Sequence, residues 1–184
     1  MKVVKNAQTA AGLHAVRDIM IHVYTGNGKG KTTASIGLCI RFVGSGKKAL
    51  MIQFLKTNGS SEIKTIEKIE NFDIKCFGRK GVLRPEDVNE EDSLLVIDGI
   101  IFLEENIEKY DLFVLDEINV AISLGLVPAE QIIAFLKKNR TKEFVLTGRN
   151  APEEIIKMAD LVTEFKEIKH YFKKGVSARE GIEY

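Results

Sequence analysis

The chain has 184 residues, a length that fits one domain able to bury a hydrophobic core without disulfide staples. Its 27 basic and 26 acidic side chains leave a formal net charge of +1, so bulk electrostatics favour neither nucleic acid nor an anionic membrane as the main partner. With 45% hydrophobic and 29% charged residues, the composition is that of a folded globular protein and excludes an intrinsically disordered chain.

Two further features bear on the compartment in which the protein works. Its two cysteines, Cys39 and Cys76, are far apart and form no zinc-type cluster, which predicts buried thiols in a reducing compartment. The N-terminus lacks the continuous apolar stretch of a signal peptide, and the most apolar later stretch, residues 94–103, is too short to span a bilayer. We therefore expect a cytoplasmic protein that does not enter a membrane.

Short β-rich runs alternate with helical patterns through the first half of the chain. A strand is predicted over residues 19–24 and, after a glycine-rich loop, a helix over residues 32–43. The same hydrophobic periods predict a strand over residues 49–55, a helix over residues 62–69 and a strand over residues 72–77. The polar segment 78–92 ends this part of the pattern.

The second half continues the alternation. Its patterns predict helices over residues 93–107, 128–139 and 152–158, and strands over residues 112–115, 144–147 and 161–165. Pro128 is expected in the first turn of the middle helix, where no N–H is needed. Strands that alternate with helices predict an α/β fold, in which helices cover both faces of a mostly parallel sheet.

The domain organisation follows from the same pattern. Residues 1–184 are expected to form a single domain, because no repeat, low-complexity segment or linker divides the chain. An N-terminal extension, residues 1–18, and a C-terminal tail, residues 166–184, lie outside the alternation. We expect both to cover a site, and frayed termini are the alternative interpretation.

A segment rich in glycine and lysine joins the first predicted strand to the first predicted helix. It consists of Thr25, Gly26, Asn27, Gly28, Lys29, Gly30, Lys31, Thr32 and Thr33. Glycines let successive backbone N–H groups surround an anion at a helix N-terminus, while Lys31 adds a positive charge and Thr32 offers a hydroxyl to Mg²⁺. The segment predicts a phosphate-binding loop, although Thr25 stands where the strict P-loop pattern has its first glycine.

The second chemical signal is an apolar strand that ends in two carboxylates. Residues 112–115 are apolar, and Asp116 and Glu117 follow them directly. At the carboxyl end of a central parallel strand these acids face the same crevice as the phosphate-binding loop, where one of them can hold Mg²⁺ directly or through water. The loop and the acid pair together predict a nucleotide site on a P-loop NTPase-like core.

Motifs that mark several other nucleotide enzymes are missing. The nearest match to the guanine-binding element of GTPases, residues 141–144, lacks its aspartate. The extra lysine, Lys29, is two residues before Lys31, whereas the deviant loops of partitioning ATPases carry theirs near the start of the loop. Two distant cysteines cannot form the zinc site of thymidine kinases with this core layout. These classes are disfavoured.

Over nearly its whole length the chain resembles the P-loop type of ATP:corrinoid adenosyltransferases. The resemblance rests on residues 25–33, 114–117, 146–149, 159–162 and 169–184. It implies a RecA-like core, transfer of the 5′-deoxyadenosyl group of ATP to the Co(I) of a reduced corrinoid, and release of triphosphate. It also implies Mg²⁺ or Mn²⁺ as cofactor, a homodimer, and a flavoprotein reductase that supplies electrons.

The resemblance also assigns roles within the site. It implies Lys31, Asp116 and Glu117 as catalytic residues, Thr32 and the two acids as metal ligands, and residues 25–33, Arg41 and Arg149 as nucleotide contacts. The nucleotide would lie in the sense opposite to that in ordinary ATPases, with C5′ exposed. Because Co(I) is itself a strong nucleophile, the site must orient C5′ and stabilise triphosphate, and no general base is expected. A solvated helix arginine and a helix-capping cation are the alternative interpretations of Arg41 and Arg149.

The chain departs from the family at one place. Relatives carry aromatic residues, including a tryptophan, in the loop after the third strand, where they are thought to displace the lower ligand of the corrinoid. This chain has no tryptophan, and its equivalent region, residues 76–83, offers Phe77, Val82 and Leu83. The natural corrinoid and the route to four-coordinate cobalt therefore stay open. We expect His22 to be a core residue and His170 a surface residue.

Two other functions remain open from the residues alone. A P-loop ATPase or phosphotransferase would use the same loop and acid pair and would release ADP. A non-catalytic, ATP-gated corrinoid-binding protein would show no turnover.

Overall fold

A computed structural model describes residues 20–79 and 85–184 of the chain. The expectation that residues 1–18 cover a site, and the suggested roles of Val82 and Leu83, lie outside these described residues.

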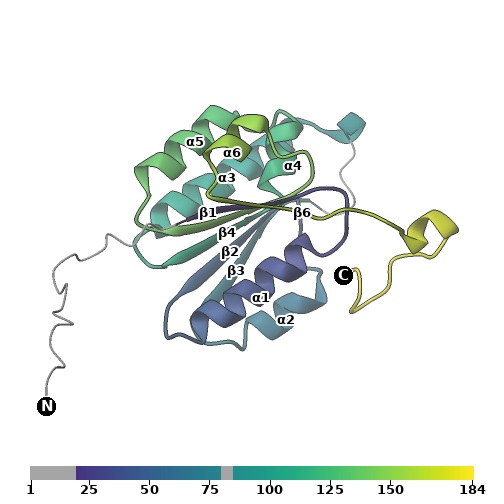
Figure 1. Ribbon diagram of the computed structural model, residues 1–184, viewed down its shortest axis with the longest axis horizontal. Helices are drawn as coiled ribbons and strands as arrows, with labels where there is room; N and C mark the ends of the chain where they lie inside the picture. Colours follow the sequence, from purple (N-terminus) through teal and green to yellow (C-terminus); the bar gives the residue numbers. More distant parts are fainter. Residues whose placement is uncertain (1–19, 80–84) are drawn as a thin grey trace, which may run out of the picture.

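The centre of the molecule is a six-stranded sheet in which every neighbouring pair is parallel (Figure 1). Its strands are β1 (Ile21–Thr25), β2 (Ala49–Phe54), β3 (Phe72–Phe77), β4 (Leu112–Asp116), β5 (Glu143–Thr147) and β6 (Leu161–Glu164). Their order across the sheet is β3-β2-β4-β5-β1-β6. The predicted parallel α/β fold is confirmed.

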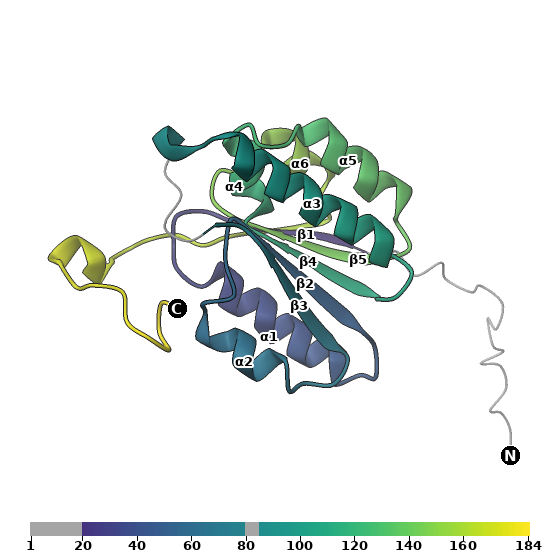
Figure 2. The same ribbon diagram turned by 180° about the vertical axis from the view of Figure 1, so that it is seen from behind.

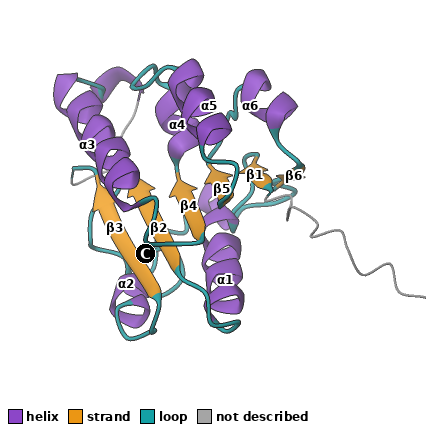
Figure 3. Ribbon diagram, turned by 90° about the vertical axis from the view of Figure 1, so that its left-hand side faces the viewer, coloured by secondary structure: helices purple, strands orange, loops and turns teal. Residues whose placement is uncertain are grey.

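Helices cover both faces of this sheet. On one face lie α1 (Lys31–Val43) and α2 (Ser61–Ile66), and on the other α3 (Glu90–Asn106), α4 (Ile118–Ser123), α5 (Ala129–Lys138) and α6 (Glu153–Met158) (Figures 1 and 2). Two short 3₁₀ turns, Pro85–Asp87 and Tyr171–Lys174, complete the elements. Figure 3 shows the sheet between the two helical layers. Among the described residues, none of the helices combines the length and the apolar character needed to cross a bilayer.

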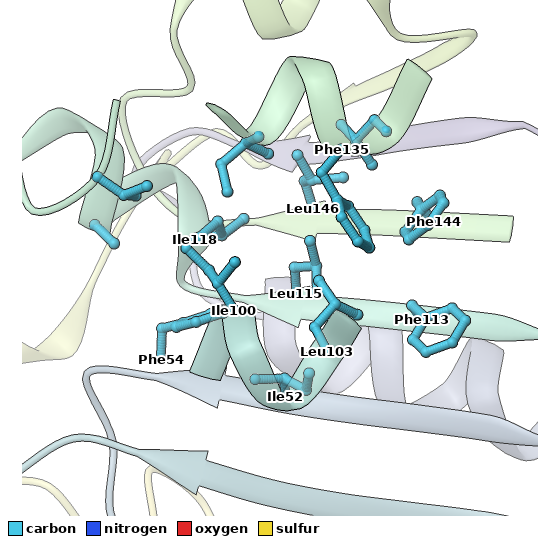
Figure 4. Close-up of a cluster of buried hydrophobic side chains, with 14 of the residues drawn as sticks. Ile52, Phe54, Ile100, Leu103, Phe113, Leu115, Ile118, Phe135, Phe144 and Leu146 are labelled. Atoms are coloured by element: carbon cyan, nitrogen blue, oxygen red, sulfur yellow. The ribbon is translucent and has the colours of Figure 1, made fainter. Parts of the chain in front are cut away.

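The larger hydrophobic core lies between the sheet and α3 to α6. Phe113 of β4 stacks on Phe144 of β5 with ring centroids 5.6 Å apart, and Ile100 and Leu103 of α3 pack against the same cluster (Figure 4). A smaller cluster lies between the sheet and α1. Because both its faces are covered, β4 is buried along its whole length, which is why its sequence is apolar without alternation.

Several element boundaries differ from the sequence predictions. Pro128 is the N-cap of α5 rather than a residue of its first turn, because its backbone is extended. Residues 118–123 form α4, which the sequence analysis did not predict because a helix of only six residues is too short to show a helical period. Of the two cysteines predicted to be buried, Cys39 is buried but Cys76 is half-buried.

The start of α3 is also earlier than predicted, and its capping residues explain why. Asn89 is the N-cap: its side chain accepts a hydrogen bond from the backbone N–H of Glu91, and Asp92 reaches back to the N–H of Asn89. This reciprocal capping box lets the helix begin in the polar segment at Glu90. Arg79 holds Asp92 from the other side, with Nε 2.7 Å from Oδ1.

The cap predicts a measurable loss of stability. Asn89→Ala is expected to lower the free energy of unfolding by about 1 kcal/mol, because the N–H of Glu91 loses its acceptor. Urea titration followed by circular dichroism measures this change. Asp98→Ala, on the exposed side of the same helix, is the matched control and is expected to change stability by less than about 0.5 kcal/mol. Equal effects of the two substitutions would contradict the capping role.

Candidate functional site

The topology gathers the candidate residues at one edge of the sheet. All strands are parallel, so the loop after β1, the acids at the end of β4 and the residues after β2 and β5 meet at the carboxyl edge. The strand β5 lies between β1 and β4, so its last residue, Thr147, stands between the loop and the acid pair. Ligands of open α/β sheets bind at this edge.

The phosphate-binding loop runs from the end of β1 to the first turn of α1. Gly30, the N-cap of α1, has a left-handed φ of 115°, a conformation that favours glycine. The backbone N–H of Gly28 donates to the carbonyl of Phe165 just after β6, at 2.5 Å. A Cβ at Gly26 or Gly28 would lie 2.6 or 2.7 Å from that oxygen. These glycines are therefore needed where the loop crosses the end of β6.

Lys31 is folded into the loop. Its Nζ donates to the carbonyl oxygens of Gly26 at 2.7 Å and Gly28 at 2.8 Å, and the residue is buried. Burial lowers the pKa of Lys31, and Arg149 lowers it further, while the carboxylate of Glu117 acts in the opposite direction. A cation held in this position can bind an anion that enters the loop.

Asp116 is the centre of a polar cluster and is fully buried. Its Oδ1 accepts from the hydroxyls of Thr147 at 2.5 Å and Thr32 at 3.0 Å. Its Oδ2 accepts from Nζ of Lys56 at 2.7 Å and Nε2 of Gln53 at 3.1 Å. One carboxylate of β4 thus accepts hydrogen bonds from four other segments: α1, β2, the loop after β2, and β5.

Glu117 follows Asp116 in a strained backbone conformation. Its φ of 63° is left-handed, which is uncommon for a residue with a side chain and is found at functional sites. Its backbone N–H donates to Oγ1 of Thr147 at 3.1 Å. Burial raises the pKa of Glu117, whereas the ammonium of Lys56, 3.8 Å away, lowers it and Asp116 raises it again. The carboxyl of Glu117 faces the cavity beside the loop.

A cavity of about 840 Å³ opens at this edge. It is lined by the loop, by the region of α2, by the acid end of β4 and by the C-terminal tail: Asn27, Gly28, Lys29, Gly30, Lys31, Thr32, Thr33, Ile36, Lys56, Ser60, Ser61, Glu62, Thr65, Glu117, Arg149, His170, Gly181, Ile182, Glu183 and Tyr184. Most of the predicted site residues are therefore in one place. His170, expected as a surface residue, is half-buried and lines this cavity.

Three of the predicted nucleotide contacts, Thr25, Gly26 and Arg41, are not among the lining residues. Thr25 uses its hydroxyl to accept a hydrogen bond from the backbone N–H of Ala151 at 3.2 Å, which ties β1 to the loop after β5. Arg41 is exposed in the last turn of α1, roughly 15 Å along the helix from Lys31. In this arrangement Thr25 has a structural contact and Arg41 is remote from the loop.

The C-terminal tail crosses the mouth of the cavity. Nζ of Lys29 donates to the carbonyl of Ile182 at 2.5 Å and to Oε1 of Glu183 at 3.2 Å. The hydroxyl of Ser61, in α2, donates to the backbone oxygen of Tyr184 at 3.1 Å. These contacts join the tail to the phosphate-binding loop on one side and to α2 on the other.

Sequence reasoning missed Lys56, Gln53 and Thr147. Each lies in or just after a predicted strand, at the edge where the parallel strands end. Two of them could have been found from the sequence. Gln53 is a polar residue within the apolar strand β2, and Thr147 is a polar residue at the end of the apolar strand β5. Lys56 gave no signal, because a lysine after a strand is ordinary in a loop.

The residues present fit a hard divalent cation. Thr32 and Asp116 offer a hydroxyl and a carboxylate 3.0 Å apart, and Glu117 is the next residue. Among residues 20–79 and 85–184, no group of three or more His, Cys, Asp or Glu side chains is arranged to hold a metal. The hydroxyl of Thr32 and the carboxylate of Asp116 suit Mg²⁺, which takes only one or two carboxylates together with water and substrate phosphates.

Two residues discussed from the sequence, Phe77 and His22, have their contacts away from the cavity. Phe77 packs against Phe102 of α3 with ring centroids 5.7 Å apart, so its ring belongs to the hydrophobic core. His22 is half-buried in β1, with Nε2 3.0 Å from Oε1 of Glu143, while its buried Nδ1 has no hydrogen-bond partner among the described residues. Neither side chain lines the cavity.

Comparisons with known proteins agree with the family resemblance of the sequence. The family model described as ATP:corrinoid adenosyltransferase BtuR/CobO/CobP matches residues 17–184. The chain is similar to a corrinoid adenosyltransferase of a Sinorhizobium species, with 34% identity over 90% of this chain and 80% of that one. It is 33% identical to corrinoid adenosyltransferase CobA of Salmonella typhimurium, over 90% of this chain and 85% of that one.

A solved structure with a similar fold is the flagellar accessory protein FlaH from Methanocaldococcus jannaschii. The TM-score is 0.53 with 16% sequence identity, over 79% of this chain and 72% of that one. At this identity the likeness concerns the fold alone, and it agrees with the predicted P-loop NTPase-like core.

Proposed function

The chain belongs to the ATP:corrinoid adenosyltransferase family, and from this premise we propose how its site carries out the reaction. Its activity is ATP-dependent transfer of an adenosyl group to a corrinoid, a step of cobalamin biosynthesis. The observation that supports our assignment of residues is the convergence of Lys31, Thr32 and Asp116 beside one cavity.

The phosphate-binding loop holds the triphosphate of ATP. Backbone N–H groups from Lys29 to Thr33 and the positive end of α1 surround the anion, and Lys31 turns from the loop carbonyls toward the phosphates. Lys29 and Arg149 add positive charge at the cavity wall. Triphosphate is the leaving group of the transfer, so contacts that stabilise it lower the barrier of the transfer itself.

The transfer is a displacement at C5′ of ATP. The cobalt(I) of the corrinoid, which is a substrate, supplies the electron pair for the new cobalt–carbon bond, and the bond from C5′ to the α-phosphate oxygen breaks. All three phosphates leave together. The protein therefore needs to align C5′ with the cobalt and to exclude water, and it needs no general base.

A divalent cation completes the site in this proposal. Thr32 and Asp116 would hold Mg²⁺ or Mn²⁺, with Glu117 beside them, because their oxygen atoms are the ligands such ions prefer. The ion would neutralise charge on the triphosphate.

We further propose a cytoplasmic homodimer that receives electrons from a flavoprotein reductase. The family resemblance supports these three points, and light scattering tests the dimer.

Analysis of the products tests the proposed reaction. The protein is incubated anaerobically with ATP, Mg²⁺ and chemically reduced corrinoid, while absorbance follows the cobalt–carbon bond and phosphorus NMR identifies the phosphates. We expect triphosphate in step with the new bond, and only when reduced corrinoid is present. ADP and phosphate as corrinoid-dependent products would replace this mechanism with a phosphotransferase. Absence of turnover with tight corrinoid binding would indicate a binding protein.

The contacts of the tail support its role as a cover of the site. Glu183 accepts hydrogen bonds from the hydroxyl of Tyr171, from the backbone N–H of Arg179 at 2.7 Å and from Lys29 at 3.2 Å. The hydrogen bond from Tyr171, followed by those from Arg179 and Lys29, lowers the pKa of Glu183 from 4.5 to about 2. A carboxylate thus fastens the tail to the phosphate-binding loop.

The docking of the tail is expected to depend on pH in the acid range. Because the pKa of Glu183 is lower in the folded protein, its contribution is complete above about pH 4.5 and is lost as the pH falls toward 2. The amide resonance of Arg179 in NMR should follow this titration. Glu183→Gln should hold that resonance at its acid position throughout, and Glu180→Gln should leave the titration unchanged. A midpoint near pH 4.5 would contradict the contact.

A further inference from the structure

Lys56 is a charged residue of the site that the proposed transfer has not used. It follows β2, and its Nζ lies 2.7 Å from Oδ2 of Asp116 and 3.0 Å from Oγ1 of Thr32. The carboxylate of Glu117 is 3.8 Å away. The ammonium therefore contacts both of the oxygen donors that would hold a divalent cation.

The ammonium of Lys56 lies between Thr32 and Asp116, in the space that a metal ion bound to both residues would need. Mg²⁺ needs ligands at about 2.0–2.1 Å in near-octahedral geometry, which leaves no room for Nζ between the same two donors. Two positive charges at this distance in a partly buried site would also repel each other strongly. Binding of the metal at Thr32 and Asp116 requires Lys56 to move away.

The surroundings of Lys56 allow such a movement. Its side chain is 28% exposed and lines the cavity, whereas Asp116 is fully buried. Glu62, near the start of α2, lines the same cavity and offers a carboxylate there. An ammonium released from Asp116 thus has acidic groups and the bound phosphates within the same cavity.

Asp116 does not depend on Lys56 alone for hydrogen bonds. Thr147, Thr32 and Gln53 also donate to its two oxygens. What Lys56 adds is a positive charge, which a fully buried carboxylate requires in the absence of a metal. The contact is therefore suited to being exchanged for another cation.

We propose that Lys56 is a positioning residue that holds the metal position in the nucleotide-free enzyme and is displaced into the cavity when a divalent cation enters with ATP. The proposal rests on the proposed function, because it takes Thr32 and Asp116 as the metal ligands. It implies that the enzyme alone binds divalent cations weakly, and that nucleotide and metal enter together.

Titration with Mn²⁺ alone, in the absence of nucleotide, tests this exchange. Free Mn²⁺ is measured by electron paramagnetic resonance with the wild-type chain and with Lys56→Met. We expect Lys56→Met to bind Mn²⁺ at least about tenfold more tightly, because the competing charge is gone. Lys56→Arg keeps the charge and should bind as weakly as the wild type. Lys64→Met, on the exposed side of α2, is the matched control and should also behave as the wild type.

The outcomes separate this proposal from the proposed function. Equal Mn²⁺ affinity of Lys56→Met and the wild type would overturn the exchange. If Lys56→Met does not fold, Lys56→Gln, whose amide still donates to Asp116, replaces it in the same titration and with the same criterion. Titration in the presence of ATP, with Asp116→Asn as comparison, tests the metal site itself. Loss of ATP-dependent Mn²⁺ binding in Asp116→Asn would support that site whichever way Lys56→Met behaves.

Discussion

Lys31→Ala is expected to lower kcat/KM for adenosyl transfer by a factor of about 10² to 10³. The figure corresponds to about 2.7–4 kcal/mol, the typical cost of removing one preorganised donor from a developing charge. The ammonium of Lys31 lies inside the loop, 2.7 and 2.8 Å from two loop carbonyls, so only a small movement brings it to a bound phosphate. Steady-state kinetics with reduced corrinoid measures the loss.

A second lysine provides the comparison for this prediction. Lys29 lies in the same loop, but its side chain is 41% exposed and its ammonium is paired with Glu183 of the tail. Lys29→Ala should therefore reduce kcat/KM by a smaller factor than Lys31→Ala. Near-normal transfer by Lys31→Ala, or an equal loss in both variants, would show that the buried lysine has no special role in stabilising triphosphate.

Much of the fold could be predicted because its signals are local. The strands β2, β4 and β5 are buried on both faces and consist mainly of consecutive apolar residues. The phosphate-binding loop was also visible, since a chain that must pass close to the backbone after β6 requires glycine at Gly26 and Gly28. In both cases the residue types needed by the structure are clustered within a short segment of the sequence.

The rest of the site could not be predicted because it depends on contacts between distant segments. Lys56 and Thr147 meet at Asp116 only after β2, β4 and β5 have paired. No spacing within the sequence encodes that meeting. Arg41 shows the opposite case: the family resemblance implied a nucleotide contact for it, whereas it lies at the far end of α1 from the loop.

Asp116→Asn is expected to destabilise the protein and to weaken metal binding together. Lys56 and Gln53 donate to Oδ2, while Thr147 and Thr32 donate to Oδ1. An asparagine has one acceptor oxygen and one NH₂ group, so either orientation points donors at donors. The loss of the buried charge that balances Lys56 adds to this, and the free energy of unfolding should fall by about 3 kcal/mol.

A double-mutant cycle with Lys56 separates the two causes of that loss. If the ion pair dominates, Lys56→Met should cost less in the Asp116→Asn background than in the wild type, with a coupling of about 1–3 kcal/mol in urea titrations. If the misdirected hydrogen bonds dominate, the two losses should add. In either case the Mg²⁺ concentration for half-maximal transfer should rise at least about tenfold in Asp116→Asn, because a ligand of the metal is lost. An unchanged Mg²⁺ dependence would exclude Asp116 as the carboxylate that holds the ion, and would leave Glu117, the next residue along the chain, as the acid to test.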